Sequence, residues 1–337
     1  MSRAVSPLKI VAALAALVVT ATIVLYLVPS NDYLLLPDAA HPVAPLVRVQ
    51  GGHDPKGPGG VYFVDVFERR ASMFEALFPS IHKGATLVPA RLIVPPGVSD
   101  KAARQADLRE MSISQRVAAA VALRQLGYHV VARPSGVVVA AIDAGSHAVG
   151  KLEPADVIVA VDGASTPTIA RLRSQLAKLK PGDSATLAIR RGDERLVVRV
   201  RTTADPSDEH RAIVGFAPEQ AAEILLPIKV QIDAGNVGGP SAGLAFALEV
   251  MEELGRNVDH GHTVAATGQI NLDGTVSPIG GARQKIFGVR AAGVDVFLVP
   301  AGDNAAIARR YAGGVRVIAV KTFPQALRAL ATLPPKP

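Results

Sequence analysis

The sequence predicts a multidomain chain of mixed α and β structure (α/β, or α+β) behind an N-terminal transmembrane helix. Three observations lead to this expectation: a long uncharged apolar run near the start, closely spaced short strand signals in the middle, and glycine-framed helices in the last third. The chain contains no cysteine, so disulfide bonds and thiolate metal sites are excluded and packed cores must stabilise the fold.

The first element is a run of nineteen uncharged residues, 10–28, which is long enough to span a bilayer. A cleavable signal peptide is the alternative, but its apolar region is normally ~7–15 residues long and precedes a small-x-small site, which is missing here. Arg3 and Lys9 precede the run, and the next basic residue is Arg48. The positive-inside bias therefore predicts a cytoplasmic tail of residues 1–9, a single-pass anchor in the cell membrane and an extracytoplasmic remainder.

The segment 29–129 is an N-terminal extracytoplasmic region with few clear signals. Residues 61–66 favour a strand, residues 112–126 have helical spacing, and the prolines from 79 to 96 predict a long surface connection.

Residues 130–205 form the next predicted domain, because strand signals there are short and separated by turn residues. A single helix is expected at 169–179. The expected strands are 137–142, 157–161, 185–189 and 196–200.

Several motifs of this domain resemble those of PDZ domains of the bacterial protease type, although Ala155 stands where the family usually has glycine. The motifs are Gly145-Ser146-His147-Ala148, residues 152–158, Val161-Asp162-Gly163 and Lys180-Pro181-Gly182-Asp183. The resemblance implies a PDZ-like β-sandwich or barrel that binds an extended peptide at a sheet edge. By position, the carboxylate-binding loop is 133–137, with Ser135, Gly136 and Val137. The alternative is a domain that packs on its neighbour as a lid or spacer.

The last region, 206–337, contains the strongest chemical signal. Gly238, Gly239 and Pro240 form a tight turn before Ser241, and the apolar spacing of the following residues predicts an amphipathic helix that ends at Gly255. A serine at a helix N-terminus lies beside unpaired backbone N–H groups, which can stabilise an oxyanion. Ser241 is therefore a candidate nucleophile, with the turn glycines as supporting residues.

The base that would activate Ser241 is identified by elimination. Residues 239–243 satisfy the Gly-x-Ser-x-Gly pattern of α/β-hydrolases, but such an enzyme needs a histidine far downstream of the serine. The only downstream histidines are His260 and His262, which look like loop residues, and their His-x-His spacing has no third metal ligand nearby. Lys285 opens a predicted helix after Gly280-Gly281, where burial and the helix dipole favour a neutral amine.

The region 206–337 resembles the proteolytic domain of Lon proteases. The matching residues are Gly-Pro-Ser-Ala-Gly at 239–243, Thr267-Gly268-Gln269-Ile270, Asp273-Gly274, Pro278-Ile279-Gly280-Gly281, Lys285, Val299-Pro300 and Asn304. The resemblance implies a Lon-type α/β fold, a dyad of Ser241 and Lys285, and Thr267 as the residue that holds the lysine. Gly238 replaces an acidic residue of the family, which leaves open whether Asp233 supplies a charge or only forms a turn.

A PDZ module inserted before such a domain resembles the membrane-anchored, motor-less Lon-like proteases of bacteria, and this resemblance covers the whole chain after the anchor. In that arrangement the 61–66 strand could join the catalytic sheet. Lon-type domains often assemble into rings, so the resemblance also implies a hexamer.

Several partners and cofactors are not expected. The chain has no Gly-x-x-x-x-Gly-Lys-Ser/Thr motif, so we expect no nucleotide and activity without ATP. The net charge of +7 is scattered, with zero in 206–337, and aromatic residues are rare, so nucleic-acid binding is not expected. No cofactor or metal is expected either.

The sequence therefore predicts an ATP-independent serine endopeptidase that cleaves loosely folded or exposed extracytoplasmic protein segments. The alternative is a non-catalytic PDZ-bearing scaffold or binding protein at the membrane surface. A third hypothesis, a histidine-dependent esterase, requires His260 or His262.

Overall fold

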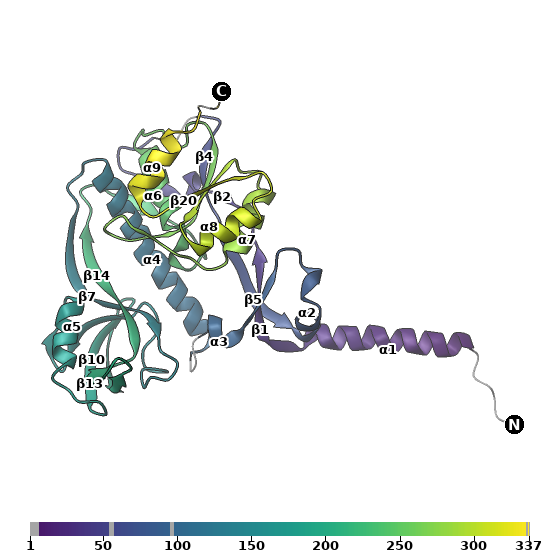
Figure 1. Cartoon of the computed structure of the whole chain (residues 1–337), viewed down its shortest axis with the longest axis horizontal. Helices are drawn as coiled ribbons and strands as arrows, with labels where there is room; N and C mark the ends of the chain where they lie inside the picture. Colours follow the sequence, from purple (N-terminus) through teal and green to yellow (C-terminus); the bar gives the residue numbers. More distant parts are fainter. Residues whose placement is uncertain (1–6, 54–56, 95–97, 335, 337) are drawn as a thin grey trace.

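The computed structural model describes residues 7–53, 57–94, 98–334 and 336. In Figure 1 the helix α1 (Pro7–Leu27) projects alone from a folded part in which the long helix α4 (Asp100–Gln125) lies between two lobes. α1 contains most of the predicted anchor, and within the described part of the chain it alone is long and apolar enough to cross a membrane. None of its residues is buried.

A small antiparallel sheet lies at the base of α1, with the strand order β5-β1-β6. Its elements are β1 (Pro29–Pro37), β5 (Val66–Ser72), β6 (Thr86–Pro89), α2 (Met73–Leu77), η2 (Pro79–Ile81) and α3 (Ala90–Ile93). The connection predicted at 79–96 therefore contains regular structure, and its residues 95 and 96 lie outside the described part. Ser72 and Glu75 cap the start of α2 reciprocally, which fixes the turn after β5.

The larger lobe is built on a five-stranded sheet with the order β2-β4-β16-β19-β20. The four strands from β4 to β20 run parallel. The strands are β2 (His41–Pro42), β4 (Gly60–Phe63), β16 (Thr263–Ala266), β19 (Val296–Pro300) and β20 (Arg316–Val320). Residues 60–63 thus join the sheet of the C-terminal region, as the resemblance implied, whereas the chain turns away at Asp65 to start β5.

Helices cover both faces of this sheet, because successive strand residues point to opposite sides. Val264 and Leu298 pack with α4, α6 (Gly243–Glu253) and α9 (Phe323–Ala331), whereas Ala265 and Phe297 pack with α7 (Ala282–Ala291) and α8 (Asp303–Arg310). Shorter elements complete the lobe: η1 (Ala44–Leu46), β3 (Val47–Val49), β15 (Val230–Ile232), η3 (Pro240–Ala242), β17 (Gln269–Ile270) and β18 (Val276–Ser277).

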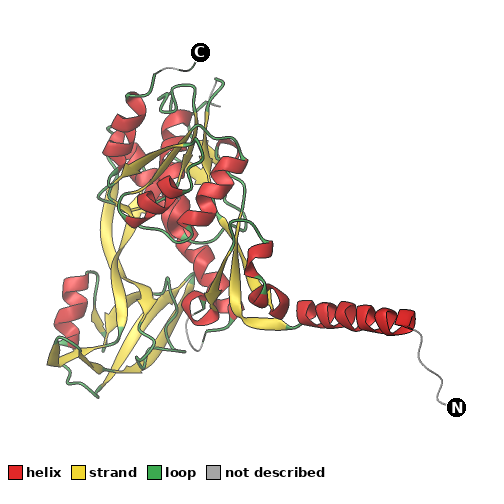
Figure 2. Cartoon of the chain, turned by 45° about the vertical axis from the view of Figure 1, so that its right-hand side comes forward, coloured by secondary structure: helices red, strands yellow, loops and turns green. Residues whose placement is uncertain are grey.

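The smaller lobe is built on an antiparallel sheet with the order β11-β10-β8-β7-β14, and β9 also pairs with β8. Its elements are β7 (Val131–Ile142), β8 (Val157–Val161), β9 (Ala164–Ser165), α5 (Ile169–Leu176), β10 (Ser184–Arg191), β11 (Glu194–Arg201), β12 (Thr203–Asp205), β13 (Asp208–Ile213) and β14 (Phe216–Leu225). Each strand signal between 137 and 200 lies in one of these strands. The folded unit continues past residue 205, where the sequence placed its end, because β14 returns to pair with β7. Figure 2 shows these two strands as a long ribbon that leads to the larger lobe.

Candidate active site

The candidate nucleophile Ser241 lies in the 3₁₀ turn η3, directly before α6. Gly239 has φ 80°, a left-handed conformation that favours glycine, and it allows the sharp entry into this turn. The helix predicted after Ser241 is confirmed, and Gly255 follows its end with positive φ. Because the helix is buried along most of its length, it fixes the position of the serine at its start.

Lys285 lies on the second turn of α7, which begins after Gly281 with φ 68°. Its Nζ lies 2.7 Å from Ser241 Oγ and 3.0 Å from Thr267 Oγ1. Both distances are within hydrogen-bonding range. The structure therefore brings together the three side chains that the sequence singled out, from three separate elements.

Thr267 follows the last residue of β16 and is completely buried. Its hydroxyl donates to the backbone carbonyl of Ser241 at 3.1 Å and accepts from the lysine, while Gly268 N–H donates to the same carbonyl at 2.7 Å. The Thr-Gly pair thus fixes both the main chain of the candidate nucleophile and the amine of the candidate base.

The amine of Lys285 is in a position that disfavours its charge. The residue is 3% exposed, and burial lowers the pKa of its amine to about 8. The negative charges of Asp65 and Glu68 act in the opposite direction and favour the ammonium form. At mildly alkaline pH a large fraction of Lys285 is therefore neutral and able to accept a proton.

The helix α4 holds the backbone of residues 238–241, the turn that carries the candidate nucleophile and is called the nucleophile turn below. Gly239 N–H donates to the carbonyl of Asp107 at 2.8 Å, and Ser114 Oγ donates to the carbonyl of Pro240 at 2.9 Å. A Cβ on Gly238 would lie 2.7 Å from Asp107 Cβ, so only glycine fits there. In this conformation the N–H of Gly239 is already engaged and must leave Asp107 before it can donate to an oxyanion.

The other polar residues discussed from the sequence lie elsewhere. His260 and His262 precede β16, at the opposite end of that strand from Thr267, and His262 Nε2 lies 2.8 Å from the carbonyl of Pro334. Asp233 accepts from Gly235 N–H at 2.9 Å, which is the contact of a turn-forming aspartate.

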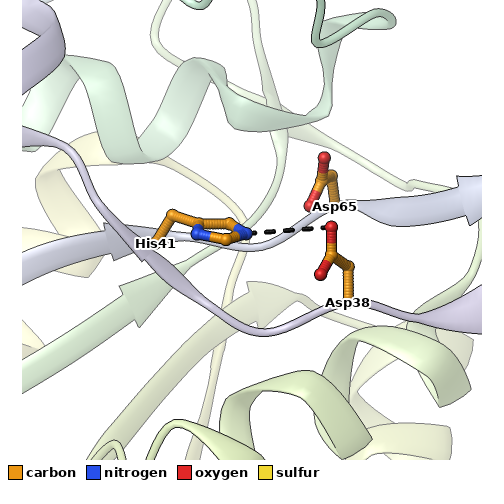
Figure 3. Close-up of side chains that lie close together, drawn as sticks. All are labelled: Asp38, His41 and Asp65. Carbon is orange, nitrogen blue, oxygen red and sulfur yellow. Dashed lines mark ion pairs between the residues drawn. The ribbon is translucent and has the colours of Figure 1, made fainter.

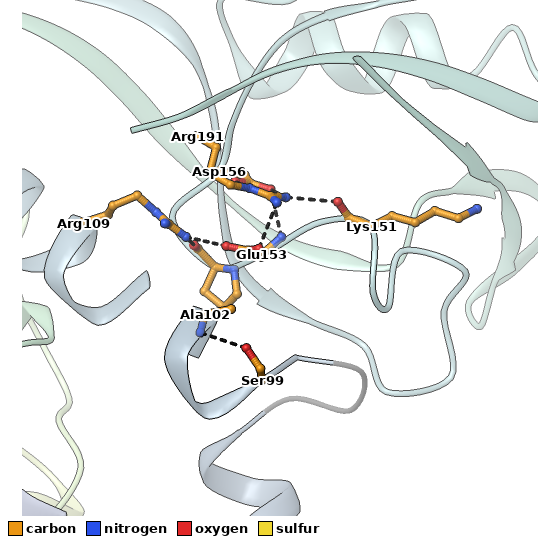
Figure 4. Close-up of polar contacts among 8 residues, drawn as sticks. Ser99, Ala102, Arg109, Lys151, Glu153, Asp156 and Arg191 are labelled. Atoms are coloured by element: carbon orange, nitrogen blue, oxygen red, sulfur yellow. Dashed lines mark hydrogen bonds and ion pairs between the residues drawn. The ribbon is translucent and has the colours of Figure 1, made fainter. Parts of the chain in front are cut away.

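Polar side chains connect α4 to the smaller lobe (Figure 4). Arg109 Nη2 lies 2.8 Å from Glu153 Oε2 and 3.3 Å from the carbonyl of Pro154. Arg191 in turn donates to Glu153 at 2.8 Å and to Asp156 at 2.7 Å. The same helix therefore contacts both the smaller lobe and the turn that carries Ser241.

The expected peptide-binding loop is part of a strand in the structure. Ser135, Gly136 and Val137 lie inside β7, whose outer edge pairs antiparallel with β14. The side chain of Gln220 on β14 donates to the carbonyls of Gly136 at 3.0 Å and Pro167 at 2.9 Å. The edge that a peptide would join, beside α5, is therefore occupied by the chain itself.

Comparisons with known proteins agree with this division into lobes. Residues 212–331 match the Lon protease (S16) C-terminal proteolytic domain, and residues 124–202 match the PDZ domain. The chain thus carries both domains, and β14 falls within the proteolytic match although it pairs with the PDZ sheet.

Individual relatives match over the proteolytic part. Lon protease 2 of Bacillus subtilis is 36% identical over 99 residues, which are 29% of this chain and 18% of that protein. Lon protease 1 of Sorangium cellulosum is 38% identical over 106 residues, which are 28% of this chain and 13% of that protein. The chain thus spans less than a fifth of these relatives. The PDZ domain of the SdrC-like protein from Listeria monocytogenes is 21% identical, with a TM-score of 0.23 over 25% of this chain and 87% of that domain.

Proposed function

We propose that this chain is a membrane-anchored serine endopeptidase in which Ser241 is the nucleophile and Lys285 the general base. The observation that carries the proposal is the 2.7 Å contact between Lys285 Nζ and Ser241 Oγ in a buried site. The match of residues 212–331 to the Lon proteolytic domain supports it.

In the proposed reaction, neutral Lys285 accepts the hydroxyl proton as Ser241 Oγ attacks the peptide carbonyl. The lysine then passes this proton to the leaving amine as the peptide C–N bond breaks, and an acyl-enzyme remains on Ser241. Water attacks this ester with the same lysine as base, which releases the new carboxyl end and restores the serine. Thr267 holds the amine in line throughout.

We propose that the substrates are loosely folded or exposed protein segments and that cleavage needs no ATP. The absence of a nucleotide-binding P-loop motif from the sequence supports this proposal, since unfolding a stable substrate needs a motor.

We propose that α1 anchors the enzyme and that the catalytic lobe faces the extracytoplasmic side. The surface around the base of α1 supports the anchoring, because Tyr26 at the end of α1 lies 6.4 Å from Phe74 of α2 between ring centroids. Large apolar side chains are also exposed between residues 67 and 81, next to the base of α1, as expected for contact with lipid. They are Phe67, Met73, Leu77, Phe78 and Ile81.

We propose that the PDZ domain regulates the catalytic lobe, because two connections support that role better than open peptide capture. β14 occupies the sheet edge beside α5, and Arg109 of α4 contacts Glu153 while Asp107 of the same helix contacts Gly239. Displacement of β14 by a peptide ligand would be transmitted along these connections to the nucleophile turn.

The test is cleavage of an unfolded model protein, without nucleotide, by the purified full chain in detergent. Ser241→Ala and Lys285→Ala should each remove the activity, whereas Lys321→Ala, which changes an exposed lysine of the same lobe, should leave it unchanged. Activity that persists in Ser241→Ala would rule out the proposed mechanism. Absence of activity in the parent, even after deletion of residues 131–225, would favour the non-catalytic scaffold.

A further inference from the structure

A second group of polar side chains lies where the chain passes between the three-stranded and five-stranded sheets. Asp38 follows β1, His41 lies in β2, and Asp65 stands between β4 and β5. One potential ligand atom from each of the three lies within 4.8 Å of the other two. Figure 3 shows both carboxylates beside the imidazole ring.

The backbone fixes these residues in place. Gly288 of α7 packs closely on Asp38, because a Cβ added to Gly288 would lie 1.7 Å from the carbonyl oxygen of Asp38. His41 pairs with Phe63 in the sheet, and their ring centroids are 5.6 Å apart. Asp38 and His41 therefore project from backbone that is packed or paired, which reduces the entropy lost when a ligand orders their side chains.

The polar atoms of this group are incompletely satisfied. Asp65 Oδ1 is buried and has no hydrogen-bond partner among the residues that the structure describes. Asp38 Oδ2 lies 3.7 Å from His41 Nε2, longer than a hydrogen bond. A buried carboxylate oxygen without a partner is costly, so a further positively charged group would stabilise the arrangement.

We propose that Asp38, His41 and Asp65 bind a divalent cation of the zinc type. Imidazole nitrogen and carboxylate oxygen are both ligand types that Zn²⁺ accepts, whereas Mg²⁺ and Ca²⁺ prefer oxygen alone. Tetrahedral Zn²⁺ with bonds of about 2.1 Å separates its ligand atoms by about 3.4 Å, so side-chain shifts of about 1 Å close the site. Water would supply the fourth ligand.

The cation would join two places where the chain leaves one sheet for the other, at residues 38–41 and at Asp65. Asp38 and Val64, the residue before Asp65, lie against Gly288 of α7, the helix that also carries Lys285. The site would therefore brace the helix that positions the candidate base.

The direct test is calorimetric titration with ZnCl₂ of the full chain, purified in detergent without a polyhistidine tag. We expect one site, and affinity at least about tenfold weaker in His41→Asn and in Asp65→Asn. His260→Asn is the matched control, because it removes a histidine that lies outside the proposed site, in the His-x-His pair, and should leave the affinity unchanged. Unchanged affinity in His41→Asn and Asp65→Asn, or a loss in His260→Asn alone, would overturn the proposal.

Two further measurements separate a lost site from a lost fold. Zinc should raise the melting temperature of the parent but not of the Asp65→Asn variant, whose side chain has nearly the same shape. The Ser241→Ala variant should bind zinc like the parent, so this test succeeds or fails independently of the peptidase proposal. An equal zinc-dependent stabilisation of Asp65→Asn and the parent would contradict the site.

Discussion

The candidate catalytic site and the candidate peptide groove were both predicted from sequence motifs, but the structure treats them differently. In the candidate catalytic site, Lys285 Nζ lies 2.7 Å from Ser241 Oγ and 3.0 Å from Thr267 Oγ1. The groove residues Ser135 to Val137 lie at a sheet edge that β14 already occupies. The candidate catalytic site is assembled from three elements that are distant in the sequence. The candidate peptide groove also forms, but β14 covers it.

The difference arises because the two sites depend on different atoms, side-chain groups in one and backbone groups in the other. The catalytic motif depends on side chains, and a hydroxyl or an amine retains its chemistry wherever the fold places it. A peptide groove depends on backbone N–H and C=O groups at a free edge, and any extended segment nearby can pair with them. A motif therefore indicates the shape of such an edge but not its availability.

The largest expected effect concerns the assembled site. Lys285→Met removes the proposed base but keeps about the length of the side chain, so kcat/KM should fall by about 10⁴-fold or more. Its melting temperature at pH 7 should equal or exceed that of the parent, because the buried charge no longer has to be desolvated. A fall in activity matched by a loss of the folded state would show instead that Lys285 is structural.

The pH dependence gives the next largest effect. With the pKa of Lys285 at about 8, kcat/KM should fall about tenfold for each pH unit below that value. The unfolded chain, with a lysine pKa of 10.5, binds more protons than the folded chain between pH 8 and 10.5. Relative to Lys285→Met, the parent should therefore gain up to about 3 kcal/mol of stability as the pH rises through this window.

Denaturant titrations of both proteins at several pH values measure that difference. A flat difference between pH 8 and 10.5, together with activity that does not change below pH 8, would show that the amine is not held in a low-pKa environment.

Much of this structure could be predicted from the sequence, because periodicity and glycine positions report local geometry. The helix after Ser241, the helix that carries Lys285 and the strands between 137 and 200 all form. The burial of Lys285 follows from its place at the start of an apolar helix.

Other features leave no mark in the sequence. Asp107 acts through its main-chain carbonyl, which every residue type possesses, so the clamp of α4 on Gly239 has no signature. The pairing of β14 with β7 is also a backbone contact between strands far apart in the chain. Asp38, His41 and Asp65 are brought together only by the crossing of two sheets, and no local spacing indicates them.

A smaller effect tests whether the groove is closed by its own strand. Gln220→Ala removes three side-chain hydrogen bonds, to the carbonyls of Gly136 and Pro167 and from Ile169 N–H, at a net cost of about 1 kcal/mol, so β14 should open about fivefold more often. Hydrogen exchange of the amides in residues 136–142 should accelerate by that factor, and the apparent affinity for C-terminal peptides should rise equally. Glu223→Ala, farther along the same strand, is the control. Equal behaviour of the two variants would mean that β14 does not limit access.

The smallest expected effect concerns the connection between the two sites. Arg109→Ala removes the contacts of α4 with Glu153 and the carbonyl of Pro154, while both domains retain their cores. A less constrained α4 should release Gly239 N–H from Asp107 more often, so peptidase activity should rise about threefold. Arg116→Ala, an exposed change on the same helix, should have no effect. Energetic coupling requires that a change at one site alter the equilibrium at the other. If both variants had the parental activity, the PDZ domain and the nucleophile turn would therefore be neighbours that are not coupled.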